Sequence, residues 1–307
     1  MKVAVTGGTG FVGQRVVEKL EKRGDEIILF TRSPEKAMKV FPKNNFSHVT
    51  AVAYTPKESG EWQNAVSGCD GVVNLAGESL SEGRWTENRK REIIASREVG
   101  TQKLVEAIDK AESKPSVLVN ASAIGYYGTS ETATFDESSP PGNDFLAEVC
   151  KRWEGAAEKV KNTGVRLAIL RFGIVLGNGG AIAKLIPPFK LYAGGPIGSG
   201  KQWFSWVHRE DVVNLILHSL DNPDMAGVYN ATAPHPVRMQ QFCDTLGRVM
   251  NRPSWLPVPG FVIETLLGDG AVVVLEGQEV LPKATQKSGF EFQYSHVKDA
   301  ITSIVKS

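Results

Sequence analysis

The chain opens with an apolar run, a glycine-rich turn and a helical pattern, in the order VAVTGGTGFVGQRVVEKL. Gly7 permits a tight turn, Gly10 lets the backbone approach a pyrophosphate, and Gly13 lets the helix pack closely on the strand. The amino terminus of such a helix offers free N–H groups and a positive dipole end to phosphates. Strand, turn and helix in this order predict a dinucleotide-binding βαβ unit. The other contacts expected from this loop are Thr9, Phe11 and Val12.

The pattern of the first turn continues along the chain. Apolar runs such as EIILFT, GVVNLA, SVLVNAS and VRLAILR alternate with helical segments such as 84–110 and 145–161. Short β-rich runs separated by amphipathic helices imply βαβ units and a parallel sheet covered on both faces. We therefore predict an α/β fold, a Rossmann-type doubly wound parallel sheet with a smaller carboxyl-terminal substrate-binding region.

The character of the sequence changes after Leu176, where Gly and Pro become frequent in LGNGGA, LIPPF and YAGGPIGSG. We predict a Rossmann domain over residues 1–175, with 207–233 returning to it. The smaller substrate or lid region then comprises 176–206 and 234–307. Ligands of doubly wound sheets bind at the carboxyl ends of the strands, so we expect the functional cleft between the two regions.

The tip of the second strand decides which dinucleotide is expected. An enzyme that prefers NAD places an acid there, on the ribose 2′-hydroxyl. This chain has Thr31 followed by Arg32. A guanidinium can hold a 2′-phosphate through charge-assisted hydrogen bonds worth about 1.5–3 kcal/mol. The sequence thus predicts NADP as the cofactor, and the alternative is that Arg32 is a solvated loop charge.

The fourth strand and the helix after it offer further contacts. Leu75, Ala76 and Gly77 are small or apolar residues at a strand end, where the chain can pass close to the adenine side of the cofactor. Glu92 and Arg97, on the following helix, are placed to reach the ribose or the phosphates. For these two charges, simple solvation on the helix surface is the competing interpretation.

Composition narrows the partners. The chain has 307 residues, with 35 Lys and Arg against 34 Asp and Glu, so no net field attracts nucleic acid or an anionic membrane. No apolar run is long enough to span a bilayer, and no targeting segment precedes the first strand. Cys69, Cys150 and Cys243 form neither a CxxC pair nor a disulfide framework, so we expect packing residues and no metal site.

Longer motifs indicate a family. TGGTGFVG, NLAG, NASAIGYYG and LRFGIVLG together resemble an extended short-chain dehydrogenase/reductase. GGPIGSGKQWFSWVHREDVV, NATAPHPV, RPSWLPVPGF and LEGQEVLP resemble its atypical NAD(P)-binding "epimerase family" branch, often labelled cell-division-inhibitor-like in bacteria. FDESSPPGNDFLAEVC and RPSWLPVPGF are most similar to plastid and cyanobacterial members. The resemblance runs over essentially the whole chain.

The resemblance implies a Rossmann-type fold, NADP as cofactor, and an oxidoreductase acting on CH–OH groups of a small molecule whose identity is not settled. It implies a chloroplast location, or the cytoplasm of a cyanobacterium, and a link by name to plastid or cell division, hence a division-related protein partner. In many relatives the helices after the fourth and fifth strands form a dimer face, which leaves a homodimer open. The cofactor contacts carried over from the family are Thr31, Arg32, Leu75, Ala76, Glu92, Arg97 and Val175.

The catalytic tyrosine and lysine of the ordinary family are missing from their expected places, where we find Phe145 and Val149. Hydride transfer to a carbonyl needs a nearby group that exchanges a proton, and neither side chain can do so. Ser122 fits the serine role of the family, with a strand-end hydroxyl bonded to backbone as the alternative. Tyr126 could place a hydroxyl in the cleft, with packing as the alternative. His208 is the histidine to test as an acid or base, and a core position is its alternative.

Three functions therefore stay open. The first is an NADP-dependent oxidoreductase of atypical mechanism. The second is a catalytically weak or inactive NADP-binding regulatory protein linked to plastid or cell division, which the absence of the tyrosine and lysine favours. The third is a nucleotide-sugar epimerase-like enzyme, which needs a proton donor just as much.

Overall fold

The computed structural model describes residues 1–80 and 83–306. Within them, seven parallel strands form one sheet in the order β11-β7-β5-β4-β1-β2-β3. The order runs outward in both directions from β1 and β4, as in a doubly wound sheet. The strands are β1 (Lys2–Thr6), β2 (Glu26–Thr31), β3 (Val49–Ala53), β4 (Gly71–Asn74), β5 (Val117–Ala123), β7 (Arg166–Phe172) and β11 (Gly227–Ala231).

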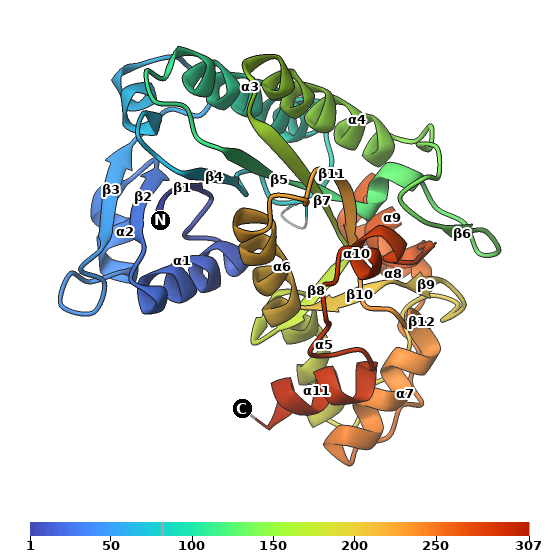
Figure 1. Ribbon diagram of the computed structural model, residues 1–307. Coiled ribbons are helices and arrows are strands. Elements are labelled where there is room, and N and C mark those ends of the chain that lie inside the picture. Colours follow the sequence, from blue (N-terminus) through green and yellow to red (C-terminus); the bar gives the residue numbers. More distant parts are fainter. Residues whose placement is uncertain (81–82, 307) are drawn as a thin grey trace.

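Helices cover both faces of this sheet (Figure 1), because successive strand residues point to opposite sides. Val3 and Val5 of β1 pack on the side of α1 (Phe11–Arg23), α2 (Pro34–Val40) and α6 (Arg209–Asp221). Ala4 packs on the other side, towards α3 (Glu87–Lys110) and α4 (Phe145–Glu158). The short 3-10 helices around this core are η1 (Glu61–Val66), η2 (Ile124–Tyr127) and η3 (Lys159–Thr163).

A second core lies below the carboxyl ends of the strands in Figure 1. There β8 (Ile174–Gly177) pairs with β10 (Trp206–His208), and β9 (Trp203–Phe204) with β12 (Val237–Arg238). The helices that pack in this core are α5 (Gly180–Lys190), α7 (Met239–Met250) and α11 (Val297–Val305). The other helices of the carboxyl-terminal segment are α8 (Gly260–Leu267), η4 (Gly268–Ala271), α9 (Val272–Leu275) and α10 (Lys283–Lys287). A last pair, β6 (Thr134–Phe135) and β13 (Glu279–Val280), ties the carboxyl-terminal segment to the loop after β5.

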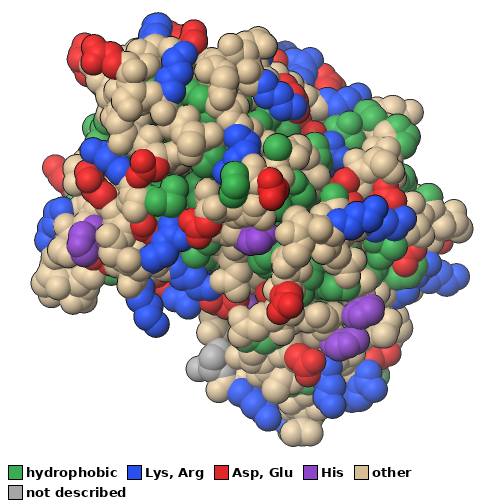
Figure 2. Space-filling model, in the orientation of Figure 1, with side chains coloured by type: hydrophobic (Ala, Val, Ile, Leu, Met, Phe, Trp, Pro, Cys, Tyr) green, Lys and Arg blue, Asp and Glu red, His purple; other side chains and the backbone are tan. Residues whose placement is uncertain are grey.

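The fold prediction is confirmed: the chain is an α/β protein with a Rossmann-type parallel sheet flanked by helices. The structure places β11 and α6 with the first 175 residues, while the exact domain limits stay a prediction. Among the described helices, none combines the length and the apolar character needed to cross a bilayer. Figure 2 shows basic and acidic side chains interspersed over one face of the molecule, in keeping with the balanced composition.

Candidate functional site

The glycine turn after β1 is built for close approach of backbone. Gly7 has a φ of +68°, a region that favours glycine. A Cβ on Gly7 would lie 2.7 Å from the carbonyl carbon of Leu75, and one on Gly13 would lie 2.2 Å from the carbonyl oxygen of Gly7. Gly10 stands at the N-cap of α1, and no side chain caps that helix end. The first turn of α1 therefore keeps its amide groups for an anion.

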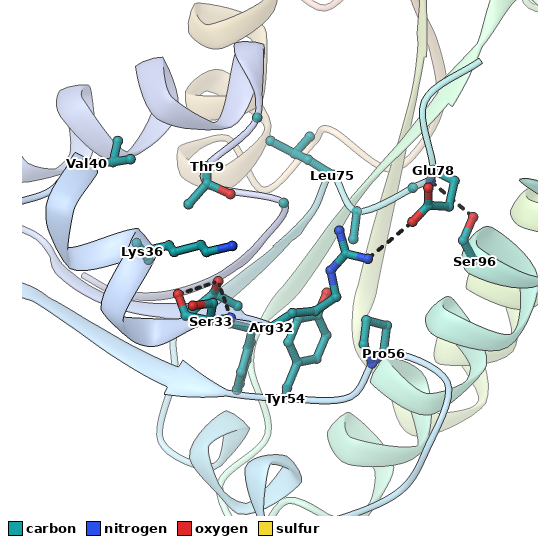
Figure 3. A pocket seen from close by; sticks show the side chains of 17 residues that line it. Thr9, Arg32, Ser33, Lys36, Val40, Tyr54, Pro56, Leu75, Glu78 and Ser96 are labelled. Carbon is teal, nitrogen blue, oxygen red and sulfur yellow. Dashed lines mark hydrogen bonds and ion pairs between the residues drawn. The ribbon is translucent and has the colours of Figure 1, made fainter. Parts of the chain in front are cut away.

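A cavity of about 680 Å³ opens beside this turn, at the carboxyl ends of β1, β2 and β4 (Figure 3). We call it the first cavity. Eight residues that the sequence predicted as cofactor contacts line it: Gly7, Thr9, Gly10, Thr31, Arg32, Leu75, Ala76 and Gly77. Nine lining residues were missed by the sequence: Phe30, Ser33, Lys36, Ala37, Val40, Tyr54, Pro56, Glu78 and Ser96. An open cavity beside bare helix amides fits a dinucleotide phosphate.

The tip of β2 carries the cationic end of the first cavity. Arg32 and Lys36 extend into the same space in Figure 3. Arg32 is 76% exposed, and its Nη1 lies 3.3 Å from Oε1 of Glu78. Glu78 also pairs with Arg89 at 3.1 Å. Exposed ion pairs contribute at most about 1 kcal/mol, so an incoming phosphate can take Arg32 from Glu78.

The remaining predicted cofactor contacts lie elsewhere. Glu92 is exposed and pairs with Lys57 at 2.9 Å, outside the first cavity. Val175 sits in β8 opposite Val207, against the core. Three residues of the glycine loop point to protein rather than to the first cavity: Phe11 under the guanidinium of Arg209, Val12 against the core, and Gly13 against the turn. Their roles as contacts stay predictions.

A second cavity, of about 300 Å³, lies at the carboxyl ends of β5 and β7. Arg97 joins the two cavities, because it lines the second and its guanidinium carbon would be 3.0 Å from a Cβ on Gly77 of the first. Its Nη1 and Nη2 donate to the carbonyl oxygens of Ile93 and Glu78 at 3.1 and 3.0 Å. Burial lowers the pKa of Arg97 from its usual value. The guanidinium also lies 5.1 Å from the ring of Trp153, a wall of the second cavity.

Helix α4 presents Leu146, Val149, Cys150 and Trp153 to the second cavity, so Val149, at the expected lysine position, lines it and Phe145 does not. Phe145 packs its ring on Trp85, at 5.3 Å, and does not line the cavity. Leu146 and Cys150, which are four residues apart, face the end of β5, 3.1 and 3.9 Å from a Cβ on Gly125. Burial raises the pKa of the Cys150 thiol to about 12. Helix α4 therefore gives the second cavity no tyrosine and no lysine.

Ser122 and Tyr126 belong to a buried network outside both cavities. Ser122 is 2% exposed and donates to Glu154 at 2.6 Å. Arg171 donates to both carboxylate oxygens of Glu154, at 2.8 and 2.7 Å, and to the hydroxyl of Tyr127 at 3.0 Å. Its guanidinium lies 3.4 Å from the ring of Tyr126. Side chains alternate along a strand, so Ala123 and not Ser122 lines the second cavity. Catalytic roles for Ser122 and Tyr126 stay predictions, and their hydroxyls do not line the cavity.

His208 lies in the interior, away from both cavities. It is 6% exposed, and burial lowers its pKa to about 4. Its Nδ1 accepts from the backbone N–H of Glu210, at the start of α6, and its ring packs against the Tyr294 ring, tilted by 36° with 3.9 Å between the centroids. His208 thus occupies a core position, the alternative that the sequence offered to an acid–base role.

Hydroxyl and carboxylate groups of the second cavity come from three separate parts of the chain, residues 129–144, Ser205 and Glu276. Thr129 donates its hydroxyl to Oε2 of Glu276 at 2.5 Å. Asp144 accepts from the N–H of Ala147 at 2.8 Å and caps α4. Ser205 has both sides of its hydroxyl engaged, donating to the Gln278 carbonyl and accepting from the Val280 N–H. No sequence signal links Thr129 to Glu276, since the fold alone brings them together.

Comparison with known proteins gives this geometry a family context. Residues 3–232 match the model of the NAD dependent epimerase/dehydratase family, and residues 258–304 match a domain of unknown function, DUF1731. An Arabidopsis thaliana protein, "Epimerase family protein SDR39U1 homolog, chloroplastic", is 52% identical over 309 residues, covering 100% of this chain and 87% of the relative. The "Epimerase family protein YfhF" of Bacillus subtilis is 38% identical over 306 residues, covering 99% and 98%.

Solved structures agree with these matches. The human epimerase family protein SDR39U1 (isoform 2), crystallised with NADPH, superposes with a TM-score of 0.87 and 33% identity, covering 100% of both chains. A UDP-glucuronic acid 4-epimerase from Bacillus cereus, with UDP-glucuronic acid and NAD, has a TM-score of 0.80 at 16% identity and covers 100% of this chain and 98% of its own. At that identity the second likeness shows the fold alone.

Proposed function

We propose that this chain, which belongs to the NAD dependent epimerase/dehydratase family, is an NADPH-dependent oxidoreductase that interconverts a carbonyl and a CH–OH group of a small molecule. The observation that carries the cofactor choice is the cationic end of the first cavity. Arg32 and Lys36 stand at the tip of β2, where an NAD-preferring chain has an acid. The human relative, similar over its whole length, was solved with NADPH, which supports the same choice.

Each part of the cofactor has residues suited to it. The amides of the glycine turn at Gly7 to Gly10 and the first turn of α1 would hold the pyrophosphate. Arg32, Ser33 and Lys36 would hold the 2′-phosphate, with the backbone of Leu75 to Gly77 alongside the adenosine. The nicotinamide, when bound, supplies or takes up a hydride. All proton transfer then falls to the side chains of the second cavity.

Proton exchange at the second cavity has few candidates. Cys150 is held protonated by burial, and the Ser205 hydroxyl is engaged on both sides. The Thr129 hydroxyl and the Glu276 carboxylate form a hydrogen-bonded pair within the cavity lining, and such a pair can pass a proton to or from a substrate oxygen. We propose this pair for the role that Ser122 and Tyr126 were predicted to fill. The Ser122→Ala variant should leave turnover within about threefold of wild type, whereas loss of turnover with unchanged NADPH affinity would restore the serine hypothesis.

Titration with NADPH and NADH, followed by nucleotide fluorescence, tests the cofactor proposal. Arg32→Ala and Lys36→Ala should each weaken NADPH about 10- to 100-fold and leave NADH nearly unchanged, because only NADPH carries the 2′-phosphate. Lys39→Ala is a matched control, as Lys39 is exposed on the same helix and does not line the cavity. Equal affinity for the two nucleotides in wild type, or an insensitive Arg32→Ala variant, would overturn the proposal.

A regulatory NADP-binding protein is the second candidate. The observation that favours it is that α4 lines the second cavity with Leu146, Val149, Cys150 and Trp153, and with no tyrosine or lysine. By similarity to the Arabidopsis relative we propose a plastid location, with cyanobacterial cytoplasm as its counterpart. A homodimer and a division-related partner also stay proposals. NADPH binding that persists through a broad carbonyl panel with no oxidation would support the regulatory function.

A further inference from the structure

We propose that the second cavity binds an electrically neutral, mainly apolar compound with one carbonyl or hydroxyl group, and that it excludes sugar nucleotides. This inference rests on the proposed function, for which it names the substrate class. Its argument uses the walls of the cavity, its charges and its polar corner.

The walls are apolar and held in place. Leu80, Leu146, Trp153, Trp203, Val272 and Val273 form them. Trp203 donates its indole N–H to the carbonyl of Glu131 at 3.1 Å, and the guanidinium of Arg238 lies 3.8 Å from its ring. A large aromatic surface that is fixed from outside the cavity is suited to a flat apolar ligand.

The charges disfavour an anionic ligand. Among the described residues that line the second cavity, Asp144 and Glu276 are carboxylates and Arg97 is the one cation. Both terminal nitrogens of Arg97 already donate to backbone carbonyls. A nucleoside diphosphate would bring two negative charges beside two carboxylates, and like charges in a partly buried site repel. The family fold is thus retained here with a lining unsuited to the diphosphate of a sugar nucleotide.

The volume of the second cavity, like its charge, disfavours a sugar nucleotide. At about 300 Å³ the second cavity is at the lower limit of small-molecule sites, and it is less than half the size of the first, at about 680 Å³. A sugar nucleotide adds a base, a ribose and a diphosphate to the sugar that reacts. A compound of one or two rings fits the space better.

The hydrogen-bonded Thr129 and Glu276, which we call the polar corner, can contact one oxygen-bearing group of the ligand. The Thr129 and Glu276 pair stands where the loop after β5 meets the carboxyl-terminal segment. Gly277 pins this corner, because a Cβ there would lie 1.9 Å from the carbonyl oxygen of Trp203. Its own carbonyl accepts from the N–H of Ser130 at 2.9 Å. Asp144 caps α4 and the Ser205 hydroxyl is engaged on both sides, so the Thr129 and Glu276 pair is the polar group we assign to one carbonyl or hydroxyl group of the ligand.

Calorimetric titration of the full-length chain with NADP⁺ present tests the proposal without relying on turnover. The probes are 2-acetonaphthone, its charged analogue 6-acetyl-2-naphthoic acid, and UDP-glucose. We expect the neutral ketone to bind about tenfold more tightly than the carboxylate, and UDP-glucose not to bind. Glu276→Gln removes a negative charge from the lining and should therefore tighten the carboxylate several-fold more than it changes the ketone, and Trp203→Ala should weaken the ketone about tenfold.

Two controls match these variants. Glu264→Gln removes an exposed carboxylate of α8, and Trp255→Ala removes an indole that is 65% exposed, and neither residue lines the second cavity. Both should behave as wild type. Binding of UDP-glucose, equal affinity for the two naphthyl probes, or no binding of the ketone up to its solubility would overturn the inference. The separate NADPH titration shows whether the proposed function falls with it, since that titration depends on Arg32 and not on these probes.

Discussion

The two cavities hold their ligands with different parts of the chain. The first is shaped by backbone: a glycine turn, a bare helix end and a strand edge, with cations at one corner. The second is shaped by side chains, mostly apolar, with two carboxylates, Asp144 and Glu276, and one cation, Arg97. Backbone amides suit a ligand shared by many enzymes, because any sequence supplies them, whereas side-chain walls can change while the fold is kept. Under the proposed function, this difference would place cofactor choice at β2 and substrate choice where α4 meets the carboxyl-terminal segment.

The largest effect should come from the buried ion pair beneath the second cavity. Glu154→Gln leaves the Arg171 guanidinium without its carboxylate, with only 4% of that side chain exposed. We expect a loss of about 3–5 kcal/mol in the free energy of unfolding, measured by urea denaturation. The double variant Glu154→Leu with Arg171→Met should recover most of it. NADPH affinity at the first cavity should stay within about twofold in the folded variant. A large loss of NADPH affinity in this variant would contradict the view that the two cavities are built independently.

The first cavity should depend most on its glycine turn. In Gly13→Ala the new Cβ would meet the carbonyl oxygen of Gly7 at 2.2 Å, so the turn must shift. We expect about 1–3 kcal/mol of destabilisation and ~100-fold weaker NADPH binding, measured by thermal unfolding and fluorescence titration. Gly155→Ala is the control, because a Cβ there meets nothing within 4 Å and a helix favours alanine by about 1 kcal/mol. If both variants bind NADPH as wild type does, the turn does not hold the pyrophosphate.

Acid should loosen the carboxyl-terminal part first. His208 lies 3.2 Å from the Ser303 hydroxyl of α11, and burial lowers its pKa to about 4. The unfolded chain takes up a proton near pH 6.5 and the folded chain only near pH 4, so stability falls as the pH drops between these values. His208→Gln should remove about 2 kcal/mol of that pH dependence in unfolding curves recorded from pH 7 to 4. Identical slopes for the variant and wild type would assign acid sensitivity to other groups.

The smallest expected effects are changes in NADPH affinity caused by variants of helix α3, where Arg97 borders both cavities and Glu92 borders neither. Arg97→Ala should weaken NADPH about tenfold, because Arg97 lies against Gly77 and borders both cavities. Glu92→Ala, five residues before Arg97 on α3, should change NADPH affinity less than twofold, since it breaks only the exposed pair with Lys57. The same fluorescence titration measures both. A larger loss of NADPH affinity in Glu92→Ala than in Arg97→Ala would contradict the placement of the cofactor in the first cavity.

Local motifs explain why most of the first cavity could be predicted. The glycine turn and the residues at the tips of β2 and β4 follow directly from strand ends, so Gly7, Arg32 and Leu75 line the cavity as expected. Ser33 and Lys36 were missed although they follow Arg32 in TRSPEK, because the register of a seven-residue helix cannot be read from so short a pattern.

Strand alternation, helix rotation and sequence distance explain why the residues that line the second cavity differ from those that the sequence suggested. A shift of one residue along a strand turns a side chain to the other face, which separates Ser122 from Ala123. One residue along a helix is a rotation of about 100°, which separates Phe145 from Leu146. Thr129 and Glu276 are 147 positions apart, and a single sequence carries no mark of such a contact.

Because Thr129 and Glu276 lie 147 positions apart, the residues of the second cavity are completed later in protein synthesis than those of the first. A ribosome makes the chain from its amino terminus, and every lining residue of the first cavity has been added once Ser96 is in place. The second cavity needs residues up to Gln278. A nascent chain therefore contains every lining residue of the first cavity long before it contains the last lining residue of the second, so the proposed substrate site is completed well after the proposed nucleotide site.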